Sequence, residues 1–242
     1  MPILKNILLI GLLGILSYYE TSAQVKRYEG TVSQQIVVIS QTPIVDWASR
    51  KKVSYAEYEK IDRSSPGRLY LDPIFDKYGR ASSFWLKSKR NGEQSGAMKI
   101  NPDMMPEVGE TLPPFVMNGL DGVLYDSEKL KGKYILLGFW VRYEKPLYTL
   151  ASTRVISEFV DKHKKRGVDI VSLGTTLNTR EECMEAIPKR NCGFIPVPES
   201  YGFNYRYQIG ETPYFILLDK QGVVKAMAPH TEFNIIGDLV LK

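Results

Sequence analysis

The chain has 242 residues, of which 43% are hydrophobic and 24% are charged, a composition that excludes disordered, collagen-like and coiled-coil proteins. Its 32 Lys and Arg outnumber its 27 Asp and Glu, so the net charge of +5 directs attention to anionic partners. Two cysteines and two histidines are too few for a zinc finger, a disulfide-rich scaffold or a multi-histidine site, and we expect no metal and no cofactor.

The N-terminus has the pattern of an export signal. Lys5 precedes an apolar run of 10 residues, Ile7 to Leu16, and small residues close the segment at Ala23. The run is much shorter than the roughly 20 apolar residues that a membrane-spanning helix needs. We therefore predict a signal peptide over residues 1–23, cleavage near Ala23, and export to the periplasm or cell envelope, with an uncleaved anchor as the alternative.

The next region is predicted to contain β-strands of no identifiable family. The β-branched run Gln35–Ser40 favours a strand, and Thr42-Pro43 opens a segment that is either helical or extended. Ser83–Lys87 and Gly96–Ile100 flank Asn91-Gly92, a dipeptide favoured in tight turns, and predict a hairpin.

The excess positive charge belongs to this N-terminal region. Residues 24–105 hold 14 cations and 9 anions, whereas residues 106–242 hold 17 of each. The cations follow no aromatic stacking pattern, so we expect no nucleic acid. We expect these cations to form a solvated surface that faces either an acidic partner or the membrane, and membrane contact is expected only through this region.

From residue 106 onward the pattern alternates between strand and helix. Tyr134–Trp140 is a continuous apolar run, typical of a central strand that is covered on both faces. Leu150–Lys165 has apolar residues at helical spacing and ends in cations before Gly167, and Val168–Gly174 predicts the next buried strand.

Two further patterns complete this half of the chain. Thr179 and Glu182 form a capping box that opens a helix over residues 180–187. Strand-like segments at Tyr214–Asp219 and Val223–Ala226 bracket a Gly-containing turn and predict a hairpin.

The order of these segments, with the turn residues between them, resembles the thioredoxin-like superfamily, specifically its exported TlpA/ResA-like (redoxin, AhpC/TSA-type) branch. Four segments carry the likeness: Gly109–Phe115, Asp121-Gly122, Leu130–Lys133 followed by Leu136–Trp140, and Thr212-Pro213 with the strand after it. The resemblance covers residues 106–242. It implies an α/β thioredoxin-like domain with a central mixed sheet flanked by helices, and a cis-proline at Pro213.

The chain departs from this family at its active-site loop. Where such proteins have an aromatic residue followed by C-x-x-C, this chain has Tyr143, Glu144, Lys145, Pro146 and Leu147. Disulfide exchange needs a thiolate nucleophile and a second, resolving thiol. Glu144 and Leu147 supply neither, so the loop is predicted to be degenerate.

Three accounts of this departure compete. In the first, the fold is kept and the protein binds a protein or peptide partner in the envelope without catalysis, which is the function we predict. In the second, Cys183 and Cys192 form a relocated redox pair of a thiol-disulfide oxidoreductase, although a static disulfide or two unpaired thiols is the simpler expectation for them. In the third, Glu144 is catalytic, but a lone acid at this place usually caps its helix.

A peptide groove is the binding surface that the resemblance implies. In thioredoxin-like folds the cis-proline lies beside the active-site loop, so Tyr143, Pro146, Thr212 and Pro213 are the expected lining. The nearby aromatic residues either extend this groove or pack in the core; they are Tyr201, Phe203, Tyr205, Tyr207 and Tyr214.

The two histidines give no support to a metal site. His163 lies in the cationic end of a predicted helix and is expected to be solvated or to compensate the helix dipole. His230 has no partner at a ligand spacing.

Overall fold

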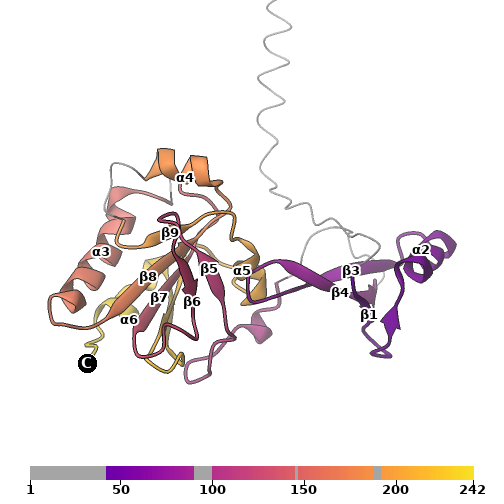
Figure 1. Ribbon diagram of the computed structural model, residues 1–242, viewed down its shortest axis with the longest axis horizontal. Coiled ribbons are helices and arrows are strands. Elements are labelled where there is room, and N and C mark those ends of the chain that lie inside the picture. The colour runs from indigo at the N-terminus through magenta and orange to yellow at the C-terminus, as the bar shows by residue number, and fades with distance from the viewer. Residues whose placement is uncertain (1–41, 90–99, 145–146, 188–191) are drawn as a thin grey trace, which may run out of the picture. The chain divides into compact units, whose positions relative to one another are not determined.

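The computed structural model describes residues 42–89, 100–144, 147–187 and 192–242 (Figure 1). The predicted signal peptide, the predicted strand at residues 35–40, the Asn91-Gly92 turn, residues 96–99, Lys145 and Pro146 lie outside these ranges. Within the ranges, no helix combines the length and apolar character needed to cross a membrane.

Residues 44–88 form a four-stranded sheet with the strand order β2-β1-β4-β3. Its strands are β1 (Ile44–Asp46), β2 (Lys52–Val53), β3 (Leu69–Phe75) and β4 (Ala81–Ser88), and helix α2 (Tyr55–Ser64) lies between β2 and β3 in sequence. The segment after Thr42-Pro43 is thus extended rather than helical. Its β-branched Ile44 is 1% exposed and pairs in parallel with Phe84 of β4.

The strand predicted at Ser83–Lys87 forms, as β4, but it does not pair with the segment predicted for it. β4 pairs with β3, which the sequence patterns missed, and with β1, so both of its edges are occupied. The β3–β4 turn is built by Asp76, whose carboxylate accepts the N–H groups of Tyr78 and Arg80, and by Gly79 at a φ of +68°. Pairing of Ser83–Lys87 with Gly96–Ile100 was therefore the wrong assignment for this strand.

Residues 134–229 contain the larger sheet, a mixed five-stranded sheet with the order β11-β10-β7-β8-β9. Strands β7, β8 and β9 are parallel, and β10 is antiparallel to both β7 and β11. The strands are β7 (Tyr134–Phe139), β8 (Ile170–Thr175), β9 (Ile195–Val197), β10 (Tyr214–Leu218) and β11 (Val224–Pro229). This confirms the α/β class and the central position of the Tyr134 strand.

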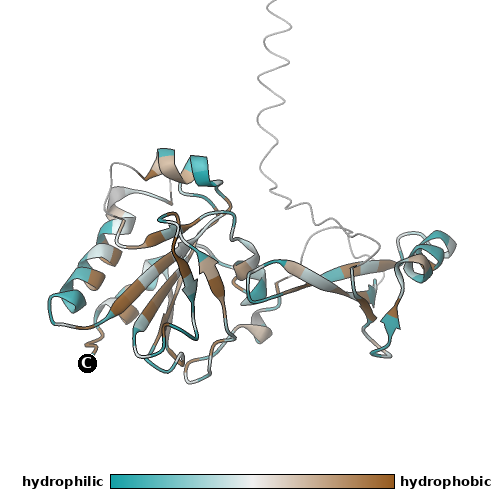
Figure 2. Ribbon diagram, in the orientation of Figure 1, coloured by the Kyte–Doolittle hydropathy of each residue, from teal (hydrophilic) through white to brown (hydrophobic). Residues whose placement is uncertain are grey.

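Helices and short elements surround this sheet. The helices are α3 (Leu150–Lys164), α4 (Arg180–Ala186), α5 (Gly202–Arg206) and α6 (Asn234–Gly237). A separate small hairpin is made by β5 (Val116–Asn118) and β6 (Leu124–Asp126), and 3-10 turns occupy Pro102–Met104 and His230–Glu232. Figure 2 shows the apolar residues concentrated in the strands and the hydrophilic ones on the helices.

Alternation along β7 creates two cores, one on each face of the sheet. Leu136 belongs to the core beneath α3 and α6, whereas Ile135, Leu137 and Phe139 belong to the core beneath α5 and β5. Every residue of β7 is buried. The strand thus has no polar face available, and its functional residues lie at its end.

Helix α3 starts later in the chain than the loop at Glu144. Thr149 caps its N-terminus, accepting the N–H of Ser152 in a reciprocal capping box, and Glu144 lies five residues before that cap. The helix ends at Lys164, and Gly167 at a φ of +79° redirects the chain, as the sequence predicts.

The tip of the β3–β4 hairpin packs tightly against α5. The ring of Phe75 stacks on Tyr205 at 5.6 Å, and the Arg206 guanidinium donates to the Phe75 carbonyl. A Cβ on Gly202 would lie 1.9 Å from the carbonyl oxygen of Gly79. Glycine at position 202 is therefore required by a backbone approach that no side chain permits.

We predict that Gly202→Ala destabilises the protein by about 1–3 kcal/mol, the usual cost of forcing extra atoms into a packed contact. Urea unfolding followed by circular dichroism measures the loss. Gly210→Ala is the matched control, since its Cβ would meet only Ile100 Cγ2 at 3.4 Å. Equal stability of the two variants would contradict the tight packing of the hairpin tip.

Candidate functional site

Two loops leave the larger sheet at the same end. β7 ends at Phe139, and its antiparallel neighbour β10 begins directly opposite, at Tyr214. The residues after Phe139 and the residues before Tyr214 are therefore neighbours. The Thr212-Pro213 bond is cis, the geometry that the family resemblance implies.

Tyr143 points into the protein and does not line a surface groove. Its hydroxyl donates to the Gly174 carbonyl at 2.6 Å, its ring is 3% exposed, and burial raises the pKa of its phenol well above the usual range. Tyr143 therefore does not line a groove as predicted together with Pro146, Thr212 and Pro213. Pro213 is buried and Thr212 is half-buried.

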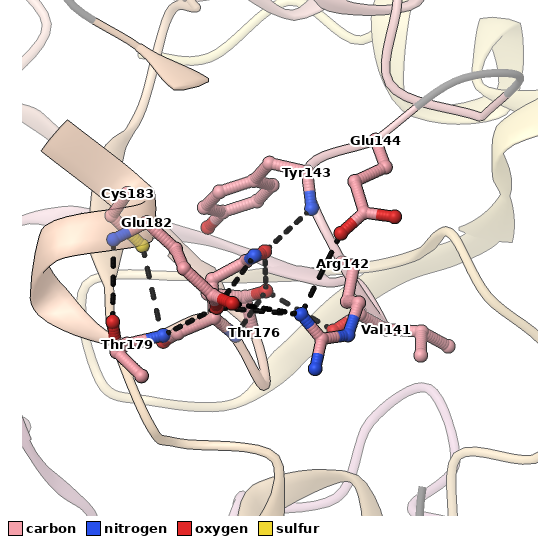
Figure 3. Close-up of polar contacts among 9 residues, drawn as sticks. Val141, Arg142, Tyr143, Glu144, Thr176, Thr179, Glu182 and Cys183 are labelled. Carbon is pink, nitrogen blue, oxygen red and sulfur yellow. Dashed lines mark hydrogen bonds and ion pairs between the residues drawn. The ribbon is translucent and has the colours of Figure 1, made fainter. Parts of the chain in front are cut away.

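Asn178 fixes the backbone of the loop. Its amide oxygen accepts the N–H of Tyr143 at 2.7 Å and the hydroxyl of Thr176 at 2.9 Å, and its amide nitrogen donates to Glu182 at 3.1 Å. The Thr176 hydroxyl also contacts the carbonyl of Val141 at 3.1 Å. Figure 3 shows Tyr143, Thr176 and Glu182 in this network. Asn178, Thr176 and Tyr143 are buried, so their hydrogen bonds fix the backbone at Tyr143.

Arg142 ties two carboxylates to this network. Its Nη1 lies 3.2 Å from Glu182 and 3.5 Å from Glu144 (Figure 3). Glu144 is 62% exposed and has a charged partner, and α3 is capped by Thr149. The expectation that Glu144 caps a helix is therefore wrong: the helix begins too far along the chain for that.

Both cysteines are free thiols in the core. Cys183 is 0% exposed and Cys192 is 5% exposed. Burial raises the pKa of Cys183 to about 12 and also raises that of Cys192. These thiols are protonated at neutral pH, the opposite of what attack on a disulfide requires.

The indole of Trp140 is at the centre of an aromatic cluster under the loop. Its ring stacks on Phe194 at 6.0 Å and meets Tyr148 edge-on at 5.7 Å. Its Nε1 is buried, with no hydrogen-bond partner in the described ranges. These aromatic rings form an apolar cluster beneath the start of the loop.

The histidines take structural positions. His163 is fully buried rather than solvated: Nδ1 contacts the Phe159 carbonyl at 2.9 Å, and Nε2 accepts the N–H of Leu241 at 3.2 Å. His230 Nε2 lies 3.2 Å from the Ser152 carbonyl. In the part of the chain that the structure describes, no group of His, Cys, Asp and Glu is arranged to hold a metal ion.

The aromatic residues before Pro213 divide between the core and the hairpin contact. Phe203 and Tyr207 are each 1% exposed and belong to the core, and Tyr205 stacks on Phe75. Sequence reasoning missed Arg142 and Asn178, the two residues that organise the loop. The Thr179–Glu182 capping box was the one available signal, because it places Glu182 beside them.

We predict that Asn178→Ala lowers the free energy of unfolding by about 1–3 kcal/mol, since the Tyr143 N–H then lacks its buried acceptor. Asn118→Ala, at an exposed strand position, is the control. Chemical denaturation of both variants tests this, and loss of stability in the control alone would refute it.

A second prediction concerns alkaline pH. The folded protein holds the proton of Cys183 more tightly than the unfolded chain does, so this thiol contributes stability below pH 9 that is lost as pH rises from 9 toward about 12. Unfolding free energies of the wild type and Cys183→Ala, measured at pH 7 and pH 10.5, should differ less at the higher pH. A difference that stays constant or grows contradicts the raised pKa.

Comparison with known proteins places residues 132–224 under a family model described as thioredoxin-like. The thiol-disulfide oxidoreductase ResA of a Bacillus cereus strain is 29% identical over 137 residues, covering 55% of this chain and 77% of the relative. ResA of Geobacillus kaustophilus is 28% identical over 127 residues, covering 51% and 70%.

Solved structures give similar alignments. A thiol-disulfide oxidoreductase from Bacteroides fragilis aligns with a TM-score of 0.42 and 24% identity, covering 49% of this chain and 89% of its own. The thioredoxin domain of a thiol-disulfide oxidoreductase from Bacteroides vulgatus aligns with a TM-score of 0.43 and 21% identity, covering 50% and 87%.

Proposed function

We propose that this chain, which matches a thioredoxin-like family model over residues 132–224 and is similar to ResA, binds a partner instead of exchanging disulfides. The observation that carries the proposal is the loop itself. Residues 141–147 contain no cysteine, and both cysteines elsewhere are buried and protonated. The partner is a protein or peptide, and the N-terminal export pattern supports a place in the periplasm or cell envelope.

The exposed part of the loop supplies the contact surface. Glu144 offers a carboxylate that is 62% exposed, and Leu147 offers an apolar side chain that is 49% exposed. Beneath them, Asn178 holds the Tyr143 backbone and Arg142 holds the Glu144 carboxylate. The surface therefore presents one acidic and one apolar side chain to a partner.

A second candidate is a thiol-disulfide oxidoreductase that uses Cys183 and Cys192, and the names of the sequence relatives favour it. Such an enzyme would have to open its core, because neither thiol is exposed. It would also have to lower the pKa of Cys183, which burial sets at about 12.

An insulin-reduction assay with dithiothreitol separates the two candidates. We expect the wild type to give no rate above that of the Cys183→Ser, Cys192→Ser double variant, because buried protonated thiols do not attack disulfides. Turnover by the wild type that the double variant lacks would overturn the binding proposal.

The binding surface is tested by capture from an envelope extract. We expect Glu144→Ala with Leu147→Ala to reduce recovery of the captured partner about tenfold, the effect of losing roughly 1.4 kcal/mol of contact energy. Leu124→Ala with Glu128→Ala is the matched control, since these side chains are also exposed but lie on or near β6. Equal recovery by both variants would exclude the loop as the contact surface.

A further inference from the structure

Among the described strands, β3 is an edge strand of the N-terminal sheet. The strand order β2-β1-β4-β3 gives β3 one strand neighbour within the described ranges, whereas β4 has two. An edge strand carries backbone N–H and C=O groups that no strand satisfies, and an extended chain can add to it. At 7 residues β3 is long enough for several such bonds.

The register identifies the outward-facing groups. The N–H of Trp47 donates to the Leu86 carbonyl at 3.0 Å, so the backbone of Leu86 turns toward β1. Leu71 is the register partner of Leu86, and partners in an antiparallel pair turn their backbone groups the same way relative to the ladder between them. The N–H and C=O of Leu71 therefore face away from β4. The bond from Lys89 N–H to the Arg68 carbonyl at 2.8 Å fits this alternation.

Pro73 belongs to the same outward-facing set. It lies two residues after Leu71 and has no N–H to offer. Proline is tolerated within strands mainly at edges, where its missing donor breaks no ladder bond. An added strand would thus find a donor at Leu71 and acceptors at Leu71 and Pro73, a pattern that fixes its register.

A hollow of about 560 Å³ borders this strand. It is lined by β3 from Tyr70 to Phe75, by Trp85 and Lys87 of β4, and by Met104 and Gln208. Met104 is 67% exposed and contributes an apolar side chain to the lining.

The charge of the hollow is positive. Its one carboxylate in the described ranges, Asp72, is neutralised by an ion pair with Lys87. Arg206 donates to backbone carbonyls, including that of Pro114 at 3.1 Å, and has no ion-pair partner in those ranges. No carboxylate in the described ranges therefore neutralises its charge.

A second cation lies over the aromatic lining. The guanidinium of Arg50 is 4.1 Å from the ring centre of Trp47 and 4.8 Å from that of Trp85, and both rings line the hollow. Arg50 adopts a φ of +59°, an unusual conformation for a side-chain-bearing residue. Residues 42–89 hold 10 cations and 6 anions, so this excess is shared by the whole sheet.

We propose that the β3 edge is a binding surface for an extended, acidic segment of a protein partner, which adds to the sheet as a further strand. Backbone bonds to Leu71 and Pro73 set its register, and acidic side chains pair with the cations beside the hollow. This surface is distinct from the Glu144 loop and does not depend on the function proposed for that loop.

A mixed library of octapeptides tests the proposal. Apolar residues alternate with a position randomised among Glu, Ser and Lys, and peptides retained by the immobilised full chain are counted by mass spectrometry. We expect Glu to be enriched over Lys by about fivefold per position, the effect of about 1 kcal/mol from one charge contact. No enrichment, or enrichment of Lys, overturns the proposal.

Two binding comparisons test whether the peptide adds to the sheet as a strand. Leu71→Pro removes the outward donor without removing a ladder bond, and should weaken binding of the enriched peptide about tenfold, whereas Leu71→Ala keeps the donor and should change it little. If Leu71→Pro unfolds, as circular dichroism would show, the same peptide N-methylated at alternate residues is used with the wild type. Unchanged binding of the methylated peptide overturns the proposal, as does retention on vesicles of phosphatidylglycerol with no peptide binding.

Discussion

The burial of β7 on both faces is the constraint on which the larger domain depends. Because β10 and β8 flank it and a core covers each face, this strand can bring residues to the surface only at its ends. The loop after Phe139 and the Thr212-Pro213 bond meet at one such end. A surface site there follows from the sheet order, whichever residues the loop contains.

The loop after β7 has no cysteine in residues 141–147. Thiol exchange needs a nucleophile at a helix N-terminus, but here α3 starts at Leu150, and Glu144 is tied to Arg142 instead. Asn178 holds the Tyr143 backbone through a buried hydrogen bond. The exposed Glu144 carboxylate and the buried thiols are the observations from which the binding proposal is argued.

The sequence predicted the elements whose signals are local. The apolar run of β7 and the Thr179–Glu182 capping box were sufficient for their elements, because burial and capping leave direct residue patterns. The pairing of β4 with β3 was missed, since cross-strand partners depend on the whole sheet and not on a nearby Asn-Gly dipeptide. For the same reason, no local pattern revealed that Asn178 contacts Tyr143, 35 residues away in sequence.

Contacts between residues distant in sequence also determine where the positive charges of the N-terminal sheet lie. Cations scattered in sequence gather beside an edge strand: Arg50 lies over two indoles, and Arg206 reaches the β3 edge from α5. A sheet whose open edge is cationic repels a second copy of itself, because like charges face each other when two such edges meet. The acidic segment that we propose for this edge pairs with the same cations, so one distribution of charge would bear on both contacts.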